Sequence, residues 1–237
     1  MIYLRHARIH DDAELPAYVV KLALPFPMAF TTPITILTGE NGKGKSTVLE
    51  ALASAMGVDT DGGSRYKTQE RTSPVPLALT RRNPPDTFFF RGDAHLNLAR
   101  YYESLGQLPG GREMADLTQM SHGQSIMTLA ERRFSAESLI FLDEPEAGLS
   151  VLRQLELLGR LGALAEAGAQ IIMATHSPIL LAAPEATIIS LDDADTTHFE
   201  DTLAVRATRD FLADPVGIAD YMVERLSLIH ISEPTRR

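Results

Sequence analysis

The chain has 237 residues and a mass of 25.9 kDa, with 44% hydrophobic and 22% charged residues. This composition is ordinary for a globular domain and excludes a disordered chain, a collagen-like repeat and a coiled-coil rod. The absence of cysteine excludes disulfides, iron–sulfur clusters and cysteine-based zinc sites, and it fits a reducing compartment. A net charge of -9 argues against a protein that coats nucleic acid through its overall charge.

No stretch of the sequence has the length and apolarity of a membrane-spanning helix. Residues 1–8 lack the apolar core of a signal peptide. The longest apolar stretch, Ile171 to Ala183, is interrupted by His-Ser-Pro at 176–178 and is too short to span a bilayer. We therefore expect a soluble, cytoplasmic protein without a transmembrane segment of its own.

Apolar runs bounded by turn residues alternate with segments of helical periodicity, which is the pattern of an α/β layered fold. In chain order, the runs predict strands over Ile2–Ile9, Tyr18–Leu24, Ile34–Thr38, Thr87–Arg91, Leu139–Leu142, Ile171–Thr175 and Thr187–Leu191. The helical periods predict helices over Lys45–Met56, Ala94–Ser104, Gly123–Phe134, Val151–Ala167 and Thr208–Leu212. Ser150 and Gly168 supply the N-cap and the C-terminal stop of the longest of these helices.

Residues 58–86 are rich in glycine, proline, serine and threonine, which predicts a long loop. We expect it to open an insert, residues 58–120, that carries a small loop and helical subdomain. The stretch 64–91 has six basic and two acidic side chains and hence a local charge of +4. Because long loops inside compact domains are often functional, this basic stretch is a candidate contact surface for a polyanionic partner.

The last residues, 226–237, resemble the translation of a transposon-type sequencing-library adapter. We expect this tail to be non-native and residues 1–225 to form a single domain. The alternative is a genuine C-terminal strand and turn.

Residues 39–46, Gly-Glu-Asn-Gly-Lys-Gly-Lys-Ser, match the phosphate-binding pattern G-x-x-x-x-G-K-[ST] at every fixed position. A predicted strand precedes this loop and a predicted helix follows it, as the pattern requires. The glycines let backbone N–H groups approach the phosphates, Lys45 reaches the β- and γ-phosphates, and Ser46 lies where it can bind Mg²⁺. The expected phosphate-binding residues are Gly39, Glu40, Asn41, Gly42, Lys43, Gly44, Lys45, Ser46 and Thr47.

The apolar strand from Ser138 to Leu142 ends in two acids, Asp143 and Glu144. A buried strand brings Asp143 to the carboxyl edge of the sheet, beside the phosphate-binding loop, where its carboxylate can help to hold Mg²⁺. Glu144 then lies next to an attacking water. Two acids after a strand are weak evidence alone, but together with the loop they predict a nucleotide site.

The strand over Ile171–Thr175 repeats this arrangement, because it is followed by His176. A histidine at this point can contact the γ-phosphate or orient water. A lone histidine at a strand end is more often structural, but open α/β sheets bind their ligands at the carboxyl edge. We therefore predict that Glu144, His176 and Lys45 are the catalytic residues.

Five motifs together resemble, in the same order, the Walker A, signature, Walker B, D-loop and switch-histidine motifs of the ABC-type ATPase superfamily. They are residues 39–46, Ser-His-Gly-Gln at 121–124, Asp-Glu-Pro at 143–145, Ala-Gly-Leu-Ser at 147–150 and Thr-His-Ser-Pro at 175–178. More narrowly, residues 1–225 resemble the small bacterial stand-alone AAA-family ATPases related to the RecF and SMC type.

The resemblance implies a P-loop NTPase fold of the ABC-ATPase type, with a RecA-like core sheet, an N-terminal antiparallel β portion and a small helical and loop insert. It implies an ATP hydrolase that uses ATP and Mg²⁺. It also implies a head-to-tail homodimer, in which Ser121 and Gly123 of one subunit, with Gln124 beside them, close over the ATP held by Lys45 of the other.

The chain departs from the superfamily pattern at two points. The signature has Met120 and His122 where transporters commonly have Leu and Gly, and no glutamine ends the strand Thr87–Arg91, where a Q-loop is expected. Asp93 is the candidate replacement for that glutamine near Mg²⁺. The residue that stacks on adenine stays open between Tyr3 and Tyr18.

Two other roles remain open. The first is the ATP-binding subunit of an ABC transporter; the missing glutamine, the unusual signature and the loop-rich insert count against it. The second is a nucleic-acid-linked repair or phage-defence ATPase, and the basic stretch 64–91 is its only supporting feature. The sequence leaves open which protein partner the ATPase acts on.

Overall fold

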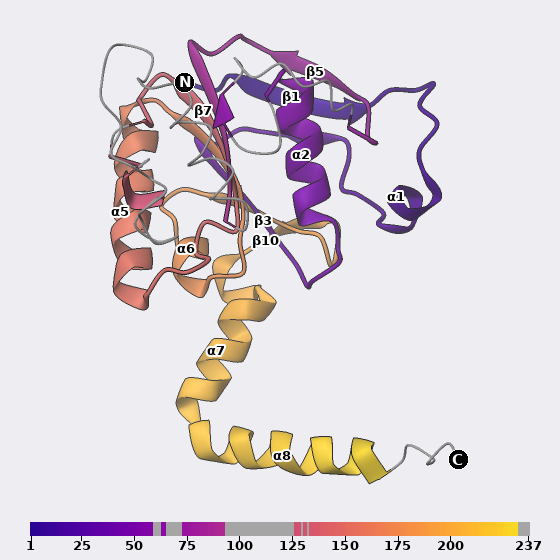
Figure 1. Ribbon diagram of the computed structural model, residues 1–237, viewed down its shortest axis with the longest axis vertical. Helices are drawn as coiled ribbons and strands as arrows, with labels where there is room; N and C mark the ends of the chain where they lie inside the picture. The colour runs from indigo at the N-terminus through magenta and orange to yellow at the C-terminus, as the bar shows by residue number, and fades with distance from the viewer. Residues whose placement is uncertain (59–62, 65–72, 93–125, 129, 132, 232–237) are drawn as a thin grey trace.

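Two β-sheets organise the protein, and helices cover both faces of the larger one (Figure 1). The computed structural model describes residues 1–58, 63–64, 73–92, 126–128, 130–131 and 133–231.

The larger sheet has seven strands in the order β10-β9-β3-β8-β7-β6-β4. Its five central strands run parallel, while β10 and β4 pair antiparallel at the two edges. Strands β3, β7 and β8 are buried along their whole length, which explains why they read as continuous apolar runs in the sequence. The seven strands are β3 (Ile34–Thr38), β4 (Gly63–Ser64), β6 (Asp86–Arg91), β7 (Ser138–Asp143), β8 (Gln170–Ala174), β9 (Thr187–Ser190) and β10 (Asp195–Thr197).

The smaller sheet is antiparallel, in the order β2-β1-β5, and consists of β1 (Leu4–Ile9), β2 (Met28–Ala29) and β5 (Leu77–Arg81). Helix α2 (Lys45–Ala55) contacts strands of both sheets. One hydrophobic cluster joins this helix to the inner faces of the two sheets, with Leu49, Leu52 and Phe141 fully buried in it. The short helix α1 (Ala17–Lys21) lies between β1 and β2 in the chain.

The other face of the large sheet is covered by α5 (Val151–Ala167) and α6 (Pro178–Leu181) (Figure 1). A second hydrophobic cluster fills this layer, with Leu157 and Leu161 of α5 fully buried. Ser150 caps α5, since its Oγ accepts the Arg153 N–H at 3.4 Å, and Gly168 ends the helix with φ 120°. Both predicted ends of this helix are therefore confirmed.

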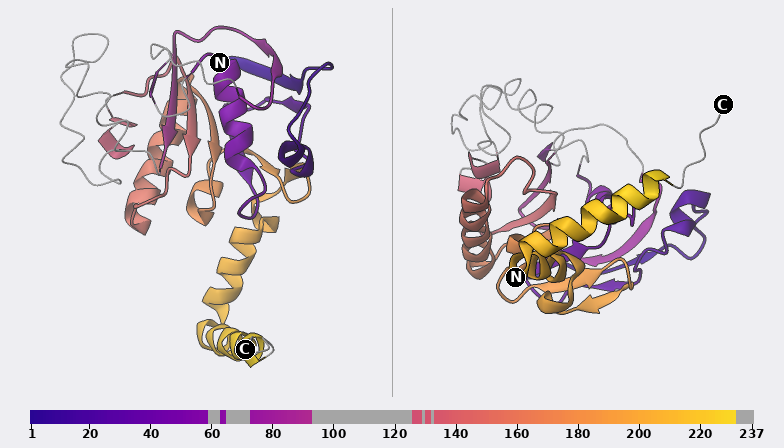
Figure 2. Two further views of the ribbon diagram at one scale, coloured as in Figure 1. Left: turned by 45° about the vertical axis from the view of Figure 1, so that its right-hand side comes forward. Right: turned by 90° about the horizontal axis from the view of Figure 1, so that it is seen from below.

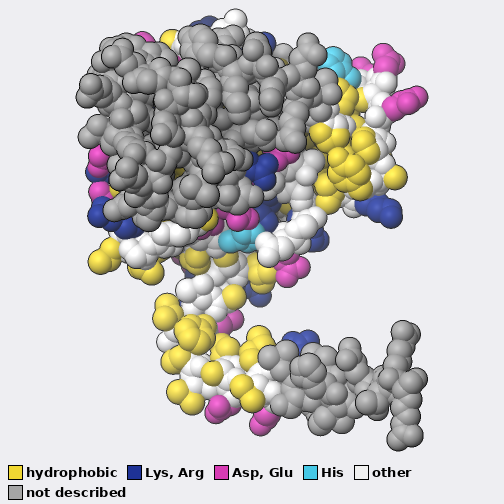
Figure 3. Space-filling model, viewed as in Figure 1, with side chains coloured by type: hydrophobic (Ala, Val, Ile, Leu, Met, Phe, Trp, Pro, Cys, Tyr) yellow, Lys and Arg dark blue, Asp and Glu magenta, His cyan; other side chains and the backbone are white. Residues whose placement is uncertain are grey.

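A short 3-10 helix (Phe199–Asp201) leads into α7 (Leu203–Ala213) and α8 (Pro215–Ile231). These two helices form an arm that projects from the body of the protein (Figures 1 and 2). Apolar side chains are exposed along the arm (Figure 3), at Leu203, Phe211, Leu212, Val216, Tyr221, Met222 and Val223. In the described part of the chain, no helix is long and apolar enough to cross a membrane.

The predicted fold class is confirmed, and most predicted elements lie within one or two residues of those observed. The predicted helix Thr208–Leu212 is part of a longer helix, α7. Of the predicted helix Gly123–Phe134, residues 126–128 and 130–131 are described and helical, while Ala94–Ser104 and most of the insert lie outside the described residues. Residues 226–231 of the tail continue α8, so the alternative of a strand there is wrong.

The predicted strand Tyr18–Leu24 is wrong, because α1 and a turn occupy these residues. Pro16 precedes the helix with φ -55°, and Val19 is the only residue of α1 that is buried. Tyr18 and Val20 are 56% and 61% exposed, so neither packs on a sheet. A short alternating run is compatible with either a strand or one helical turn, and periodicity alone does not separate them.

The interpretation of residues 58–86 as one long loop is also wrong in part, since β5 lies inside this segment. Strand β5 pairs with β1 and is only half-buried, with Thr80 and Arg81 exposed at its end. Its apolar pattern is correspondingly short and follows closely on Pro74 and Pro76, which favoured the loop assignment.

Gln170 ties the small sheet to the large one. Its fully buried side chain accepts the backbone N–H groups of Tyr3 and Leu4, both at 2.8 Å, and donates to the Leu4 carbonyl at 2.9 Å. The three bonds satisfy the backbone at the point where the chain enters β1. Buried backbone groups without such partners are costly.

Leucine is similar to glutamine in size, so the substitution Gln170→Leu still fills the buried site but removes all three hydrogen bonds. We expect the free energy of unfolding to fall by about 2–5 kcal/mol, because three buried backbone groups lose their partners. Urea denaturation followed by circular dichroism measures the change. The control Glu166→Leu, at the exposed carboxyl end of α5, should change stability by no more than about 0.5 kcal/mol. A Gln170→Leu protein as stable as the wild type would contradict this account.

Candidate nucleotide-binding site

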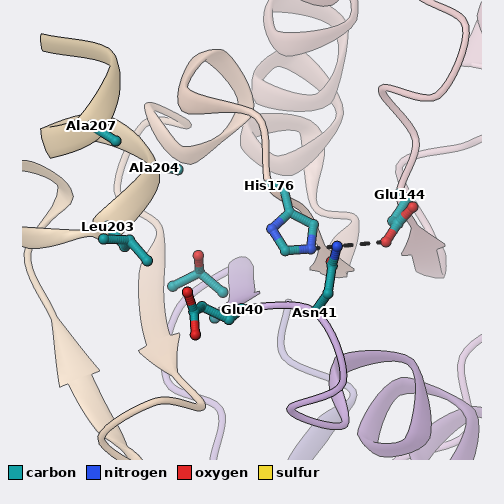
Figure 4. A pocket seen from close by; sticks show the side chains of 9 residues that line it. Glu40, Asn41, Glu144, His176, Leu203, Ala204 and Ala207 are labelled. Atoms are coloured by element: carbon teal, nitrogen blue, oxygen red, sulfur yellow. Dashed lines mark ion pairs between the residues drawn. The ribbon is translucent and has the colours of Figure 1, made fainter. Parts of the chain in front are cut away.

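Strands β3, β7 and β8 end side by side, and the chain beyond each of them supplies a group of predicted site residues. A cavity of about 750 Å³ opens at this edge of the sheet (Figure 4). Its walls are Thr38, Gly39, Glu40, Asn41, Glu144, His176, and Leu203, Ala204 and Ala207 of α7. The phosphate-binding loop, one Walker B acid and the switch histidine are therefore brought together as predicted.

The loop over residues 39–46 has the backbone shape of a phosphate cradle. Gly42 and Gly44 have φ values of 81° and 92°, which favour glycine. A Cβ on Gly44 would lie 2.8 Å from the end of the Leu24 side chain, so another residue there would have to displace Leu24 in addition to adopting a strained φ. Gly44 is the N-cap of α2, whose free backbone N–H groups face the loop, and such a helix start favours bound anions.

Lys45 is buried in this loop and is 5% exposed. Its Nζ donates to the carbonyl oxygens of Gly39 at 2.8 Å and Glu40 at 3.0 Å. Burial lowers the pKa of Lys45, and the nearby carboxylates, Glu144 foremost, oppose that shift. The ammonium group therefore lies inside the loop, held by two of its carbonyl oxygens.

Asp192, just beyond β9, anchors the loop from the side of that strand. Its Oδ1 accepts the Glu40 N–H at 3.2 Å and lies 3.6 Å from the Lys43 Nζ. A Cβ on Gly39 would contact Leu191 and Asp192 at 3.3 and 3.4 Å. The close approach of this segment therefore favours glycine at the first position of the loop.

Ser46 lies in the first turn of α2 and Asp143 is the last residue of β7. The two are hydrogen-bonded, since the Ser46 Oγ donates to the Asp143 Oδ1 at 3.0 Å. Burial raises the pKa of Asp143 from 3.8 to about 6, although the Ser46 hydrogen bond and the charge of Arg91 oppose the shift. A hydroxyl and a buried carboxylate are ligands that Mg²⁺ accepts, and Mg²⁺ normally takes its remaining ligands from water and phosphate. Within the described ranges, no group of three or more His, Cys, Asp or Glu side chains is placed to hold a metal ion.

Arg91 lies at the end of β6 and donates to the Glu50 Oε1 at 2.6 Å. This ion pair places the Arg91 guanidinium near Asp143. Glu50 therefore neutralises one of the six basic side chains of the stretch 64–91. Asp93, the candidate Q-loop replacement, lies outside the described residues.

Glu144 is held in an unusual backbone conformation, with φ 48°. Its N–H donates to the Ala174 carbonyl at 2.9 Å, and its own carbonyl accepts the Ala147 N–H at 3.0 Å. Gly92 packs against this turn, because a Cβ there would overlap the Glu144 carbonyl oxygen and approach the Ala147 Cβ to 2.9 Å. Positive φ values at non-glycine residues cluster at functional sites, where the surroundings enforce them.

His176 faces Glu144 across the cavity (Figure 4), with its Nε2 4.0 Å from the Glu144 Oε1. The two side chains are 36% and 51% exposed, respectively. Among the described residues, His176 Nε2 has no hydrogen-bond partner. Buried polar atoms without a hydrogen-bond partner are few in folded proteins, and such an atom is a candidate contact for a ligand or a water.

Four predicted site residues cannot be compared with this geometry. Ser121, Gly123 and Gln124 of the signature lie outside the described residues, as does Asp93. Of the two adenine candidates, Tyr3 is 6% exposed within the hydrophobic core and Tyr18 lies on α1.

Three further residues at this site were not predicted from the sequence: Gly92, Glu146 and Asp192. Asp192 follows the strand Thr187–Leu191 as His176 follows the strand before it, so the same strand-end argument could have identified it. Glu146 is the third acid within four residues at 143–146. Gly92 carries no local signal, because its importance depends on a contact with a turn far away in the chain.

Comparisons with known proteins agree with this site. Residues 22–91 match a family described as "AAA domain", and this part contains the P-loop. Residues 109–182 match a family described as "AAA domain, putative AbiEii toxin, Type IV TA system", and this part contains Asp143, Glu144 and His176.

Curated relatives of the chain are ATP-binding proteins. It is 30% identical over 161 residues to "Cytochrome c biogenesis ATP-binding export protein CcmA" of Salmonella typhi, covering 60% of this chain and 76% of that protein. It is also 30% identical over 166 residues to a "Putative ABC transporter ATP-binding protein" of Streptomyces avermitilis, covering 63% of this chain and 30% of that protein. The chain therefore spans only about a third of the length of the Streptomyces relative.

The P-loop, the Walker B acids and these relatives define the class of protein. The chain belongs to the AAA-domain P-loop ATPases that are related to the ABC ATPases. This confirms the recognised family and the α/β P-loop fold.

Among solved structures, the chain is similar to the "SMC head domain from Thermotoga maritima", with a TM-score of 0.44, 15% identity, and coverage of 80% of this chain and 94% of that one. It is also similar to a bacterial Atm1-family ABC exporter with ATP bound, with a TM-score of 0.45, 16% identity, and coverage of 87% and 42%.

The raised pKa of Asp143 predicts a dependence of stability on pH. Between pH 3.8 and about 6 the folded protein keeps a proton on Asp143 that the unfolded chain releases, so stability falls as the pH rises through this window. Asp143→Asn removes the buried charge. We expect it to raise the free energy of unfolding of the nucleotide-free protein at pH 7.5 by about 1–3 kcal/mol, with no gain near pH 4.

Urea denaturation of both proteins at several pH values measures this difference, with Asp12→Asn on an exposed loop as the control. A loss of stability in Asp143→Asn that is equal at pH 4 and pH 7.5 would contradict the burial of an ionisable carboxyl group there.

Proposed function

We propose that the protein hydrolyses ATP with Mg²⁺ at a site that a second copy of the chain completes. One observation carries the proposal: Glu144 and His176 face each other across a cavity that the start of the P-loop also lines. Lys45 is hydrogen-bonded to two of the lining residues, Gly39 and Glu40, and the Ser46–Asp143 pair lies directly beside Glu144 in the chain. Phosphoryl transfer needs these parts, namely a phosphate cradle, oxygen ligands for the metal and a group that orients the nucleophile.

Ser46 and Asp143 would hold Mg²⁺, and the metal would neutralise charge on the β- and γ-phosphates. Burial raises the pKa of Asp143 to about 6, which is still below neutral pH, and a bound cation would favour the ionised carboxylate further. Lys45 would exchange its two carbonyl acceptors, Gly39 and Glu40, for phosphate oxygens, which attract an ammonium more strongly.

Glu144 is the group that would orient and deprotonate the attacking water. Its carboxylate is half-exposed to the cavity, and its backbone is fixed by the Ala174 and Ala147 hydrogen bonds. His176, whose Nε2 has no hydrogen-bond partner in the described part of the protein, would contact the γ-phosphate or the same water. Each group then acts from the end of a strand, where its position is set by the sheet.

The second copy would supply Ser121, Gly123 and Gln124. The resemblance to ABC-type ATPases assigns these signature residues to the ATP of the opposite subunit. The cavity supports such a role, since Glu144 and His176 both keep part of their surface open to solvent. A docking partner would cover that opening and exclude water from the reaction.

Two substitutions test the proposal. Lys45→Ala should abolish ATP binding, because the ammonium and its phosphate contacts are removed. Glu144→Gln should keep ATP binding but slow phosphate release by about 10²–10⁴-fold, the scale for a general base. In the Glu144→Gln protein, ATP-dependent dimers should accumulate and be visible by light scattering.

The control is Glu166→Gln at the far end of α5, which should hydrolyse ATP like the wild type. Undiminished hydrolysis in Glu144→Gln would overturn the role of Glu144. A wild-type protein that neither binds nor hydrolyses ATP would overturn the proposed function itself.

A second candidate role is the ATP-binding subunit of a transporter. The observation in its favour is the 30% identity to an ATP-binding export protein over 76% of that protein's length. Co-purification of the chain with a membrane-embedded subunit from cells that express the neighbouring genes would support this role. Recovery of the chain alone from the same extract would count against it.

A further inference from the structure

We infer that Glu146 is a positioning residue that fixes His176, and that it couples the turn after Glu144 to the switch histidine. The inference rests on the proposed function, in which His176 acts on the γ-phosphate or the attacking water. It assigns a role to a side chain for which the sequence alone predicted none.

The contact that carries the inference is a carboxylate bridging two backbone amides. The Glu146 Oε1 accepts the N–H of His176 at 2.8 Å and the N–H of Ser177 at 3.2 Å. These amides lie in the loop just after β8, whereas Glu146 lies in the turn after β7. An ionised acceptor makes such bonds shorter and stronger than a neutral one. The backbone that carries the His176 side chain is therefore held by the neighbouring turn.

A second set of hydrogen bonds joins the same two segments. The Ser177 Oγ donates to the Gln154 Oε1 at 2.6 Å, and the Gln154 Nε2 donates to the Leu149 carbonyl at 3.1 Å. The Ser177 Oγ also accepts the N–H groups of Ile179 and Leu180, which caps α6. We call residues 175–177, which follow β8, the switch loop. Glu146 joins this loop to the turn after β7, and Gln154 joins it independently to the start of α5.

The turn that holds Glu146 is itself well fixed. Its Glu146 carbonyl accepts the Leu149 N–H at 2.9 Å, and Gly92 packs against its first residues. The second carboxylate oxygen of Glu146 is buried and has no partner among the described residues. Among the described residues, the two amides after β8 are therefore the hydrogen-bond partners of this carboxylate.

Glu144 and Glu146 belong to one short turn, so the coupling sets the relative position of Glu144 and His176. Their facing atoms are 4.0 Å apart. Without Glu146, the switch loop loses its anionic acceptor and His176 moves relative to Glu144 and the P-loop. Misplacement of a catalytic group by about 1 Å can lower a rate by about 100-fold.

A double-mutant cycle tests the inference. Glu146→Ala should lower kcat by roughly 10- to 100-fold and leave the affinity for a fluorescent ATP analogue within about twofold of the wild-type value. In a His176→Ala background the same substitution should have little further effect on kcat, because Glu146 acts through His176. Glu146→Gln, which keeps an acceptor oxygen for both amides, should recover much of the lost activity. The control Glu156→Ala removes a carboxylate from α5 that pairs with Arg153 and Arg160 and does not contact the switch loop.

Equal kcat losses from Glu146→Ala in the wild-type and His176→Ala backgrounds would overturn the inference while leaving the ATPase activity intact. A readout independent of turnover is the ring signal of His176 in a ¹H–¹³C spectrum, identified by its disappearance in His176→Ala. This signal should shift in Glu146→Ala, return towards its wild-type position in Glu146→Gln and stay unchanged in Glu156→Ala. An unmoved His176 signal in Glu146→Ala would overturn the inference even if the protein proved not to hydrolyse ATP.

Discussion

The register of three parallel strands is the constraint on which the site depends. Ala174 of β8 pairs with Leu37 of β3 on one side and with Asp143 of β7 on the other. The residues that follow these positions therefore emerge at the same level of the sheet, as Gly39, Glu144 and His176. Because side chains alternate between the two faces of a strand, a slip of one residue in any pairing would turn the site residues away from each other. Alternate residues of all three strands pack into two different hydrophobic clusters, so a slip would disrupt the packing of both.

The site also concentrates features that cost stability. Asp143 is ionisable and nearly buried, Lys45 is buried among backbone carbonyls, and Glu144 has a left-handed backbone. Such features persist only where the surroundings enforce them. Here the enforcing contacts are the tight packing of Gly92 against the turn, the Ser46 hydrogen bond to Asp143 and the Glu146 bridge to the switch loop. Under the proposed function, phosphate oxygens would supply negative charge beside Lys45, and Mg²⁺ would supply positive charge beside Asp143.

The sequence is most informative where function and local structure coincide. The P-loop and the buried strands were predictable because their motif and their apolar runs are local signals. The segment Tyr18–Leu24 and strand β5 were not, because their state depends on which surface they pack against. The candidate site likewise contains residues with a local sequence signal and residues without one. Strand ends identified Asp143, Glu144 and His176, whereas Gly92 and Glu146 act through contacts between segments distant in the chain, and no single local pattern encodes those contacts.

The central claim is that the P-loop, the turn after β7 and the loop after β8 form one nucleotide-responsive unit. Hydrogen–deuterium exchange with and without Mg²⁺ and a slowly hydrolysed ATP analogue tests it directly. The account predicts that protection against exchange increases together in residues 39–47, 143–149 and 175–177. Protection confined to the P-loop, or absent from all three segments, would contradict it.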